Sequence, residues 1–369
     1  CNRDSAKSEG REPGGDFDLP NDADLDDDAA RSVLDSDLPV LDAQTHFLEY
    51  DLSQPAGDTF FGDAFPHANC GERDHRSCFS IDSYIKTMFT QSETALTVIS
   101  AVAAPDPHQG EARVEFMDRA RDRVKEAVGG DRVLIHGLLA PSTRALSAVL
   151  DDLEVIAATY KVAGWKGYTN NGRGWRLDDG NRAGPQVGLA SLQKILDLGI
   201  PRVCVHKGIS GGDDWLSPAD VGPAARQFPE IKFGVYHCGW EPGVVEGAFT
   251  PATVGDGSNR LFASLQKAGV KKGANVYGEI GTTWFNVRNE PDQAAHLLGK
   301  LLKFVGEDNI LWGTDSIWYG SPQFLIDSLR SFRISNEFQE TFGYPELTPK
   351  IKGKILSRNV AEFYDLDLS

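Results

Sequence analysis

Four short runs of β-branched or apolar residues each end in a side chain that can bind a metal ion. The runs are VLDAQTHF (40–47), VCVHKG (203–208), FGVYHCG (233–239) and ILWGTDS (310–316). The metal-binding side chains at their ends are His46, His206, His237 and Asp315. The carboxyl ends of the strands of a parallel barrel meet on one face, so these side chains can surround a single ion. Imidazole and carboxylate ligands predict Zn2+ or Mn2+, with a position left for water.

The first run carries a further polar side chain on the same side of the strand. Residues alternate between the two faces of a strand, so Gln44 and His46 can face the same ion. A glutamine offers only a neutral carbonyl oxygen, which is a weaker ligand for a transition metal than imidazole or carboxylate. We therefore expect Gln44 to be a weak or outer-sphere partner of the ion. Asp42 is expected to support the strand end through hydrogen bonds.

From residue 39 onwards, short apolar runs alternate with longer amphipathic stretches. Strands are predicted at 39–44, 95–101, 132–138, 162–167, 202–206, 231–236, 275–279 and 309–313. Helices are predicted at 113–128, 143–160, 188–198, 218–227, 258–268, 291–305, 321–332 and 348–364. This alternation favours a (β/α)8 TIM barrel over residues 39–369. A doubly wound open sheet is the alternative, but no Gly-rich phosphate turn follows the first strand.

Two long connections, residues 47–82 and 168–187, leave from the face where a barrel keeps its active site, and we interpret both as substrate lids. Aromatic residues near strand ends and in the loops that follow them predict a pocket for an aromatic or cyclic substrate. These residues are Trp165, Tyr168, Trp240, Trp284 and Trp318. Arg173 and Arg176 of the second lid either clamp a substrate carboxylate or are solvated loop side chains.

The net charge of −17 argues against binding to nucleic acid or to an anionic membrane surface. No apolar run approaches the ~20 residues of a transmembrane helix. Residues 1–38 are acidic and poor in large apolar side chains, which predicts a disordered tail. Its start at Cys1 is typical of a lipidated bacterial lipoprotein of the cell envelope or periplasm. A fragment boundary is the alternative, in which case a cytoplasmic location is expected.

The other cysteines do not have the spacing of a zinc knuckle. Cys70 and Cys78 flank a polar loop and either form a disulfide or remain two free thiols. Cys204 and Cys238 lie within apolar strands and are expected to be small core residues.

The chain resembles the amidohydrolase superfamily, in its amidohydrolase-related branch of metal-dependent hydrolases and non-oxidative decarboxylases. The resemblance covers about residues 39–366. Its most specific parts are GEDNILWGTD (306–315) and IKGKILSRNVAEFY (351–364). It implies a first-strand His-x-His or Glu-x-His pair, histidines on the fifth and sixth strands, and an aspartate on the eighth. The matching residues here are Gln44, His46, His206, His237 and Asp315, of which Gln44 departs from the pattern.

By this resemblance, His46, His206 and Asp315 hold one divalent ion, Zn2+ first and Mn2+ as the alternative. Asp315 accepts a proton from an activated water molecule, and His237 is a general acid or base or holds the substrate carbonyl. Lys166 matches a fourth-strand position where some amidohydrolases carry a carboxylated lysine. An ordinary ion pair with an acid such as Glu279 is the favoured interpretation.

Hydrolysis of an amide, ester or lactone bond in a small molecule is therefore the first functional hypothesis. Decarboxylation of an aromatic or unsaturated carboxylic acid is the alternative. A third hypothesis, supported only by Gln44, is a metal-poor binding protein without turnover. The resemblance also implies that the chain can form a homodimer.

Overall fold

A computed structural model of the chain describes residues 12–20, 26–34, 36–54, 65–68, 70–180 and 184–368. The expectation for Cys1 and the remainder of the acidic tail lies outside these residues. None of the helices in the described ranges is both long and apolar enough to cross a membrane.

Eight parallel strands form a single sheet in the order in which they occur along the chain. They are β2 (Val40–Thr45), β3 (Thr94–Ile99), β4 (Val133–Leu139), β5 (Gly164–Tyr168), β6 (Arg202–His206), β7 (Lys232–Tyr236), β8 (Val276–Glu279) and β9 (Ile310–Leu311). The sheet closes because the segment after β9 pairs with β2. The Asp315 N–H donates to the Gln44 carbonyl at 2.9 Å. The chain therefore folds as the predicted (β/α)8 barrel.

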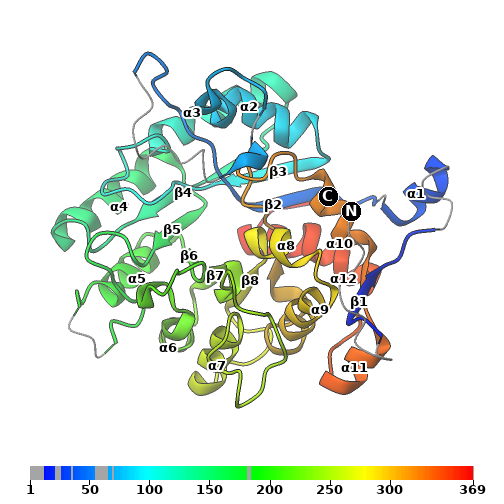
Figure 1. Ribbon diagram of the computed structural model, residues 1–369. Helices are drawn as coiled ribbons and strands as arrows, with labels where there is room; N and C mark the ends of the chain where they lie inside the picture. The colour runs from blue at the N-terminus through cyan, green and yellow to red at the C-terminus, as the bar shows by residue number, and fades with distance from the viewer. Residues whose placement is uncertain are drawn as a thin grey trace.

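Helices surround the barrel, as Figure 1 shows for α3 to α7 and α9. The longer helices are α1 (Asp27–Leu34), α3 (Val114–Val128), α4 (Leu146–Tyr160), α5 (Gly188–Asp197), α7 (Asn259–Ala268), α9 (Pro291–Lys300) and α10 (Gln323–Ser331). The shorter ones are α2 (Ile81–Ile85), α6 (Val221–Gln227), α8 (Gly281–Val287), α11 (Asn336–Phe342), α12 (Pro349–Gly353) and α13 (Asn359–Tyr364).

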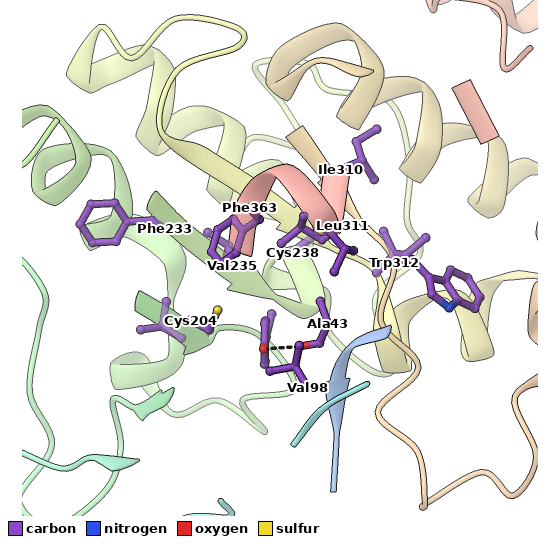
Figure 2. Packing of buried hydrophobic residues seen from close by; sticks show 14 of the residues in the cluster. Ala43, Val98, Cys204, Phe233, Val235, Cys238, Ile310, Leu311, Trp312 and Phe363 are labelled. Atoms are coloured by element: carbon purple, nitrogen blue, oxygen red, sulfur yellow. Dashed lines mark hydrogen bonds between the residues drawn. The ribbon is translucent and has the colours of Figure 1, made fainter. Parts of the chain in front are cut away.

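Buried apolar side chains fill the interior of the barrel and the space between its strands and the surrounding helices. Figure 2 shows buried side chains from several strands, among them Ala43 of β2, Phe233 of β7 and Ile310 of β9. Cys204 and Cys238 are buried free thiols, as predicted. Burial of β-branched and aromatic side chains is what makes the strands read as apolar runs in the sequence.

All eight predicted strands are present, with ends within about three residues of the expected positions. The N-terminal tail differs from the prediction, because Gly15–Phe17 forms β1 and pairs antiparallel with β10 (Phe332–Ile334). The Phe17 and Phe332 rings lie 5.5 Å apart, and Arg333 binds the Asp16 carboxylate. The edge strand β10 and this ion pair order a segment whose composition alone predicts disorder.

The two expected lids are long connections whose described parts are mostly turns and short helical segments. In the first, Cys70 and Cys78 form a disulfide, which decides between the two alternatives for these cysteines. Residues 55–64 and 69 of this connection lie outside the described ranges. Residues 181–183 of the second connection also lie outside the described ranges.

A buried ion pair fastens the second connection to the end of β6. Lys207 Nζ lies 2.9 Å from both carboxylate oxygens of Asp220, and both side chains are fully buried. The Leu177 N–H donates to the same carboxylate at 3.0 Å. Lys207 directly follows His206, so this pair ties the lid segment to a strand end that carries a candidate site residue.

We expect Asp220→Asn to lower the free energy of unfolding by about 3 kcal/mol, because it leaves a buried ammonium without a counter-charge. Urea titration monitored by circular dichroism measures this loss. The double variant Lys207→Met/Asp220→Leu should recover most of it. Glu154→Gln, which breaks the exposed Lys194–Glu154 pair, is the matched control and should cost under about 1 kcal/mol. Equal losses in Asp220→Asn and this control would contradict the expectation.

Candidate active site

A cavity of about 710 Å3 opens at the carboxyl ends of the strands. Its floor contains four of the predicted site residues, Gln44, His46, His206 and Asp315. Its walls are largely aromatic and apolar, and its rim carries charged side chains. The wall and rim residues are Leu48, Tyr50, Asp51, Gln54, Phe65, Arg76, Val102, Ala103, Glu111, Tyr168, Asn170, Ile209, Leu216, Thr282, Trp318 and Tyr319.

His46 and Asp315 face each other across this floor. His46 Nδ1 lies 2.8 Å from the Ser100 carbonyl oxygen, which can only accept, so this nitrogen carries a hydrogen. His46 Nε2 lies 3.1 Å from Asp315 Oδ1. In a neutral His46 these two atoms would both be acceptors. The contact therefore calls for a positive charge at this point, either a proton on His46 or a bound cation.

The Asp315 carboxylate is held by donors on both oxygens. Gln44 Nε2 donates to Oδ1 at 2.9 Å, and the Thr282 hydroxyl donates to Oδ2 at 2.5 Å. Burial alone would raise the pKa of Asp315, but the His46 contact, the nearby His237 and Thr282 together hold this pKa well below its ordinary value. Asp315 is therefore ionised at neutral pH.

His206 and His237 form a second contact, with His237 Nε2 lying 3.1 Å from His206 Nδ1. Burial lowers the pKa of His237 to about 3 against the opposing effect of the Asp315 charge, and burial also lowers that of His206 well below its usual value. Both imidazoles are therefore neutral. His206 lines the cavity, whereas His237 is fully buried behind it and is not among the lining residues. The predicted role of His237, as a general acid or base or as the group that holds the substrate carbonyl, stays a prediction.

The chemistry of these residues fits a divalent metal ion, although their arrangement is one of hydrogen-bonded pairs. Ligation requires neutral imidazole and ionised carboxylate, and these are the states that burial and hydrogen bonding impose on His206 and Asp315. Gln44 turns its amide N–H to Asp315 and leaves its Oε1 without a hydrogen-bond partner. Within the described ranges, no three His, Cys, Asp or Glu side chains already converge on one point as metal ligands.

Asp42 supports the end of β2, as predicted. Its carboxylate accepts the Gln44 N–H at 3.0 Å, the Thr314 N–H at 3.1 Å and the Thr314 hydroxyl at 2.5 Å. These bonds tie β2 to the segment that carries Asp315. Burial raises the pKa of Asp42 to about 7 in spite of these hydrogen bonds.

Lys166 lies fully buried beneath the cavity, and the expected ion pair with Glu279 is absent from the described structure. Lys166 Nζ has no hydrogen-bond partner there and lies 3.9 Å from the centre of the Tyr236 ring. Burial lowers the pKa of Lys166 to about 8. Glu279 instead accepts the backbone N–H of His237.

Two of the predicted substrate-binding residues line the cavity, namely Tyr168 and Trp318. The Trp318 ring stacks on His46 at 5.5 Å and on Phe65 at 5.0 Å, which places an aromatic wall directly beside the candidate metal ligands. The Tyr168 ring stacks on His206 at 5.4 Å. An aromatic substrate is thus matched by the shape and chemistry of this wall.

The other four predicted substrate-binding residues do not line the cavity. Trp165 and Trp284 are fully buried, and the Trp284 indole N–H donates to the Leu325 carbonyl in the outer layer. Trp240 is buried beside the loop that follows β7, and Arg173 is exposed. Arg176 pairs with Asp178. Large indoles near strand ends pack as readily into the shell of helices as into a pocket, so sequence position alone cannot separate the two.

Thr282, Phe65 and Arg76 line the cavity but were not proposed as site residues from sequence, and Tyr319, an aromatic residue near a strand end, lines it as well. Thr282 and Tyr319 share a hydrogen bond of 3.0 Å between their hydroxyl groups. Neither threonine nor arginine in a loop carries a spacing that would indicate a site. The proximity of Tyr319 to Trp318 and Asp315 was the only available signal.

Comparison with known proteins agrees with this fold. A family model described as amidohydrolase matches residues 41–366. No sequence among the curated proteins matches the chain. The solved structures that resemble it include an uncharacterized TIM-barrel protein from Bordetella bronchiseptica, with 13% identity, a TM-score of 0.54 and coverage of 88% of this chain and 98% of that one.

Two aromatic-acid decarboxylases are also similar in fold. The 2,6-dihydroxybenzoate decarboxylase from Rhizobium has 13% identity and a TM-score of 0.51, over 89% of this chain and 99% of its own. A dihydroxybenzoic acid decarboxylase from Polaromonas, crystallised with manganese and 2-nitroresorcinol, has 14% identity and a TM-score of 0.50, over 89% and 97%. The eight parallel strands define a (β/α)8 barrel, and the polar floor of the cavity is a candidate site at its strand ends. The extent of the family match shows that the chain belongs to the amidohydrolase family.

The residue that holds His46 is itself supported by a buried histidine. His136 Nδ1 lies 2.9 Å from the Ser100 hydroxyl, and His136 Nε2 lies 2.8 Å from the Tyr364 hydroxyl. Burial, with the charges of Lys166, His46 and Arg202, lowers the pKa of His136 to about 3. Between about pH 3 and pH 6.5 the unfolded chain therefore binds one more proton at this residue than the folded chain does.

This difference predicts that His136 makes the folded state less stable as pH falls from 6.5 towards 4. The loss of stability is up to about 1.4 kcal/mol per pH unit, and above pH 6.5, where the imidazole is neutral in both states, His136 adds no pH dependence. Urea unfolding of His136→Gln at several pH values should show a shallower dependence than the wild type. Tyr364→Phe keeps the buried imidazole, so it should lower stability but retain the slope. Identical slopes in His136→Gln and wild type would refute the expectation.

Proposed function

We propose that this protein hydrolyses an amide, ester or lactone bond in an uncharged aromatic or cyclic substrate. The observation that carries the proposal is the facing pair of His46 Nε2 and Asp315 Oδ1 at the base of an aromatic-walled cavity. This pair requires a cation or a proton between its two acceptors. A positive charge at this point is what a hydrolytic site needs in order to activate water and polarise a carbonyl group.

His46, His206 and Asp315 would hold a divalent ion, with Gln44 as an outer partner that donates to Asp315. The ion would supply a water molecule of lowered pKa and polarise the scissile carbonyl. Three protein ligands leave an open position, which is the usual pattern of catalytic rather than structural sites. Zn2+ and Mn2+ both suit this ligand set, and manganese is the ion in the Polaromonas structure.

Side chains around this point orient one another and transfer protons. Thr282 and Gln44 hold the Asp315 carboxylate in one orientation, so that it can accept a proton from the attacking water. His237 contacts two residues of the cavity floor, His206 at 3.1 Å and Gln44 at 3.5 Å, which makes it a proton partner or orienting group for the His206 imidazole. The stacked rings of Trp318 and Phe65 would hold the flat part of the substrate.

The charge of the cavity favours an uncharged substrate over a carboxylate. The lining includes the acidic residues Asp51, Glu111 and Asp315. Arg76 is the one Lys or Arg side chain in the described lining, and Asp74 binds its guanidinium with contacts of 2.6 and 3.0 Å. The protein groups of the described lining therefore repel a substrate carboxylate, which only the divalent ion on the floor would attract.

Decarboxylation of an aromatic acid is the second candidate. Similarity in fold to two enzymes described as decarboxylases of dihydroxybenzoic acids supports it, as does the aromatic wall. Release of carbon dioxide from 2,6-dihydroxybenzoate would favour this candidate, whereas acid production from a neutral ester or lactone would favour hydrolysis.

We expect the metal-loaded wild type to hydrolyse neutral aromatic probes such as dihydrocoumarin, 4-nitrophenyl acetate or acetanilide. Asp315→Asn should lower kcat/KM at least about 100-fold, because it removes the proton acceptor and a ligand. Arg132→Gln, on the exposed surface at the opposite ends of the strands, is the control. Absence of turnover on every neutral probe, together with carbon dioxide release from the aromatic acid, would overturn hydrolysis.

Gln44 makes metal content a separate test. We expect the wild type to retain close to one equivalent of Zn2+ or Mn2+ and Gln44→His to bind it about tenfold more tightly, because imidazole is the better ligand. Elemental analysis and calorimetric titration measure the two quantities. If the wild type stays metal-free while Gln44→His loads, the third hypothesis, a binding protein without turnover, becomes the better account.

A further inference from the structure

The segment Glu279–Thr283 (EIGTT) joins β8 to α8 directly behind the candidate active site. Three of its side chains form hydrogen bonds with His237 or Asp315. Glu279 and Thr283 bond to the backbone of His237, and Thr282 bonds to the Asp315 carboxylate. Neither Glu279 nor Thr283 lines the cavity. Their hydrogen bonds to the site residues both go to the backbone of His237.

The backbone of His237 has a conformation that a histidine rarely adopts. Its φ is +65°, and that of Cys238 is +53°. The left-handed region costs a non-glycine residue about 1–2 kcal/mol, so neighbouring contacts must hold both residues there. This turn directs the His237 imidazole towards His206 rather than along the direction of β7.

Two side chains hold the His237 peptide groups from opposite sides. The His237 N–H donates to Glu279 Oε2 at 3.2 Å, and the Thr283 hydroxyl donates to the His237 carbonyl at 3.0 Å. The Cys238 thiol also donates to the Glu279 carbonyl at 2.9 Å. All of these groups are buried, so each bond is protected from exchange with water.

Glu279 is fixed in place by two glycines. A Cβ atom at Gly281 would lie 2.7 Å from Glu279 Oε1, and one at Gly313 would overlap the same atom. The Gly281 N–H also donates to Oε1. The two carboxylate oxygens thus have separate backbone donors, and the side chain fits only because both glycines lack a Cβ.

We propose that Glu279 and Thr283 are positioning residues that hold His237 in its left-handed conformation and so set its contact with His206. Thr282 of the same segment orients Asp315. A single element thereby aligns both residues to which proton transfer is assigned. The catalytic consequence rests on the proposed hydrolysis, whereas the alignment of the two histidines does not.

Thr283 offers the sharper experiment, because a Glu279 variant could fail to fold. Thr283→Val keeps the shape of the side chain and removes the hydroxyl, whereas Thr283→Ser keeps the hydroxyl. Thr253→Val is the matched control, since the Thr253 hydroxyl also donates to a backbone carbonyl, that of Ala248, at 2.7 Å, but outside the site. Thr283→Val and Thr253→Val should each lose about 1 kcal/mol of stability in urea titration.

The distinguishing measurement is the 15N spectrum of histidine-labelled protein, with the His237 signals assigned from His237→Gln. Thr283→Val should shift the ring signals of His237 and His206, while Thr283→Ser and Thr253→Val leave them in place. Dihydrocoumarin hydrolysis should show kcat lowered about tenfold or more in Thr283→Val, with KM within about twofold, and recovered in Thr283→Ser. Unchanged His237 and His206 signals in Thr283→Val would overturn the proposal. A wild type without turnover would refute the hydrolysis alone, because the spectra do not depend on it.

Discussion

The closure of the barrel between β2 and the segment after β9 is the constraint on which the site depends. The Gln44 carbonyl accepts the Asp315 N–H in this closure, and the His46 N–H donates to Ser316. The same pairing brings His46 Nε2 to 3.1 Å from Asp315 Oδ1. Residues from the two ends of the barrel sequence thus meet because the sheet has no free edge, and Asp42 reinforces the junction by binding Thr314.

A second constraint is the burial of charged and polar groups without bulk water. Asp315 stays ionised because donors surround it, whereas His206 and His237 stay neutral because burial disfavours their charged forms. These opposite effects on the pKa values leave a carboxylate beside neutral imidazoles, which are the states that metal ligation needs. Burial and hydrogen bonding, rather than residue type alone, therefore set the protonation states on the floor of the cavity.

Gln44 links the organisation of the site to its function. Its amide donates to Asp315 and lies 3.5 Å from His237 Nε2, so it connects the two pairs of residues. An imidazole or carboxylate at this position would offer a ligand instead of a donor. At this position the chain supplies a hydrogen bond that orients the carboxylate.

The sequence by itself determined the barrel and the four strand ends that bear His46, His206, His237 and Asp315, because strand periodicity and chain order suffice to place them on one face. It also indicated the supporting role of Asp42. Only the tertiary structure decided that Trp318 faces the cavity while Trp165 and Trp284 pack elsewhere, and that His237 lies behind His206. Side-chain direction after a strand ends depends on the backbone turn and its distant partners. Glu279 and Thr283 impose the left-handed conformation of His237 from another strand, so no local pattern records it.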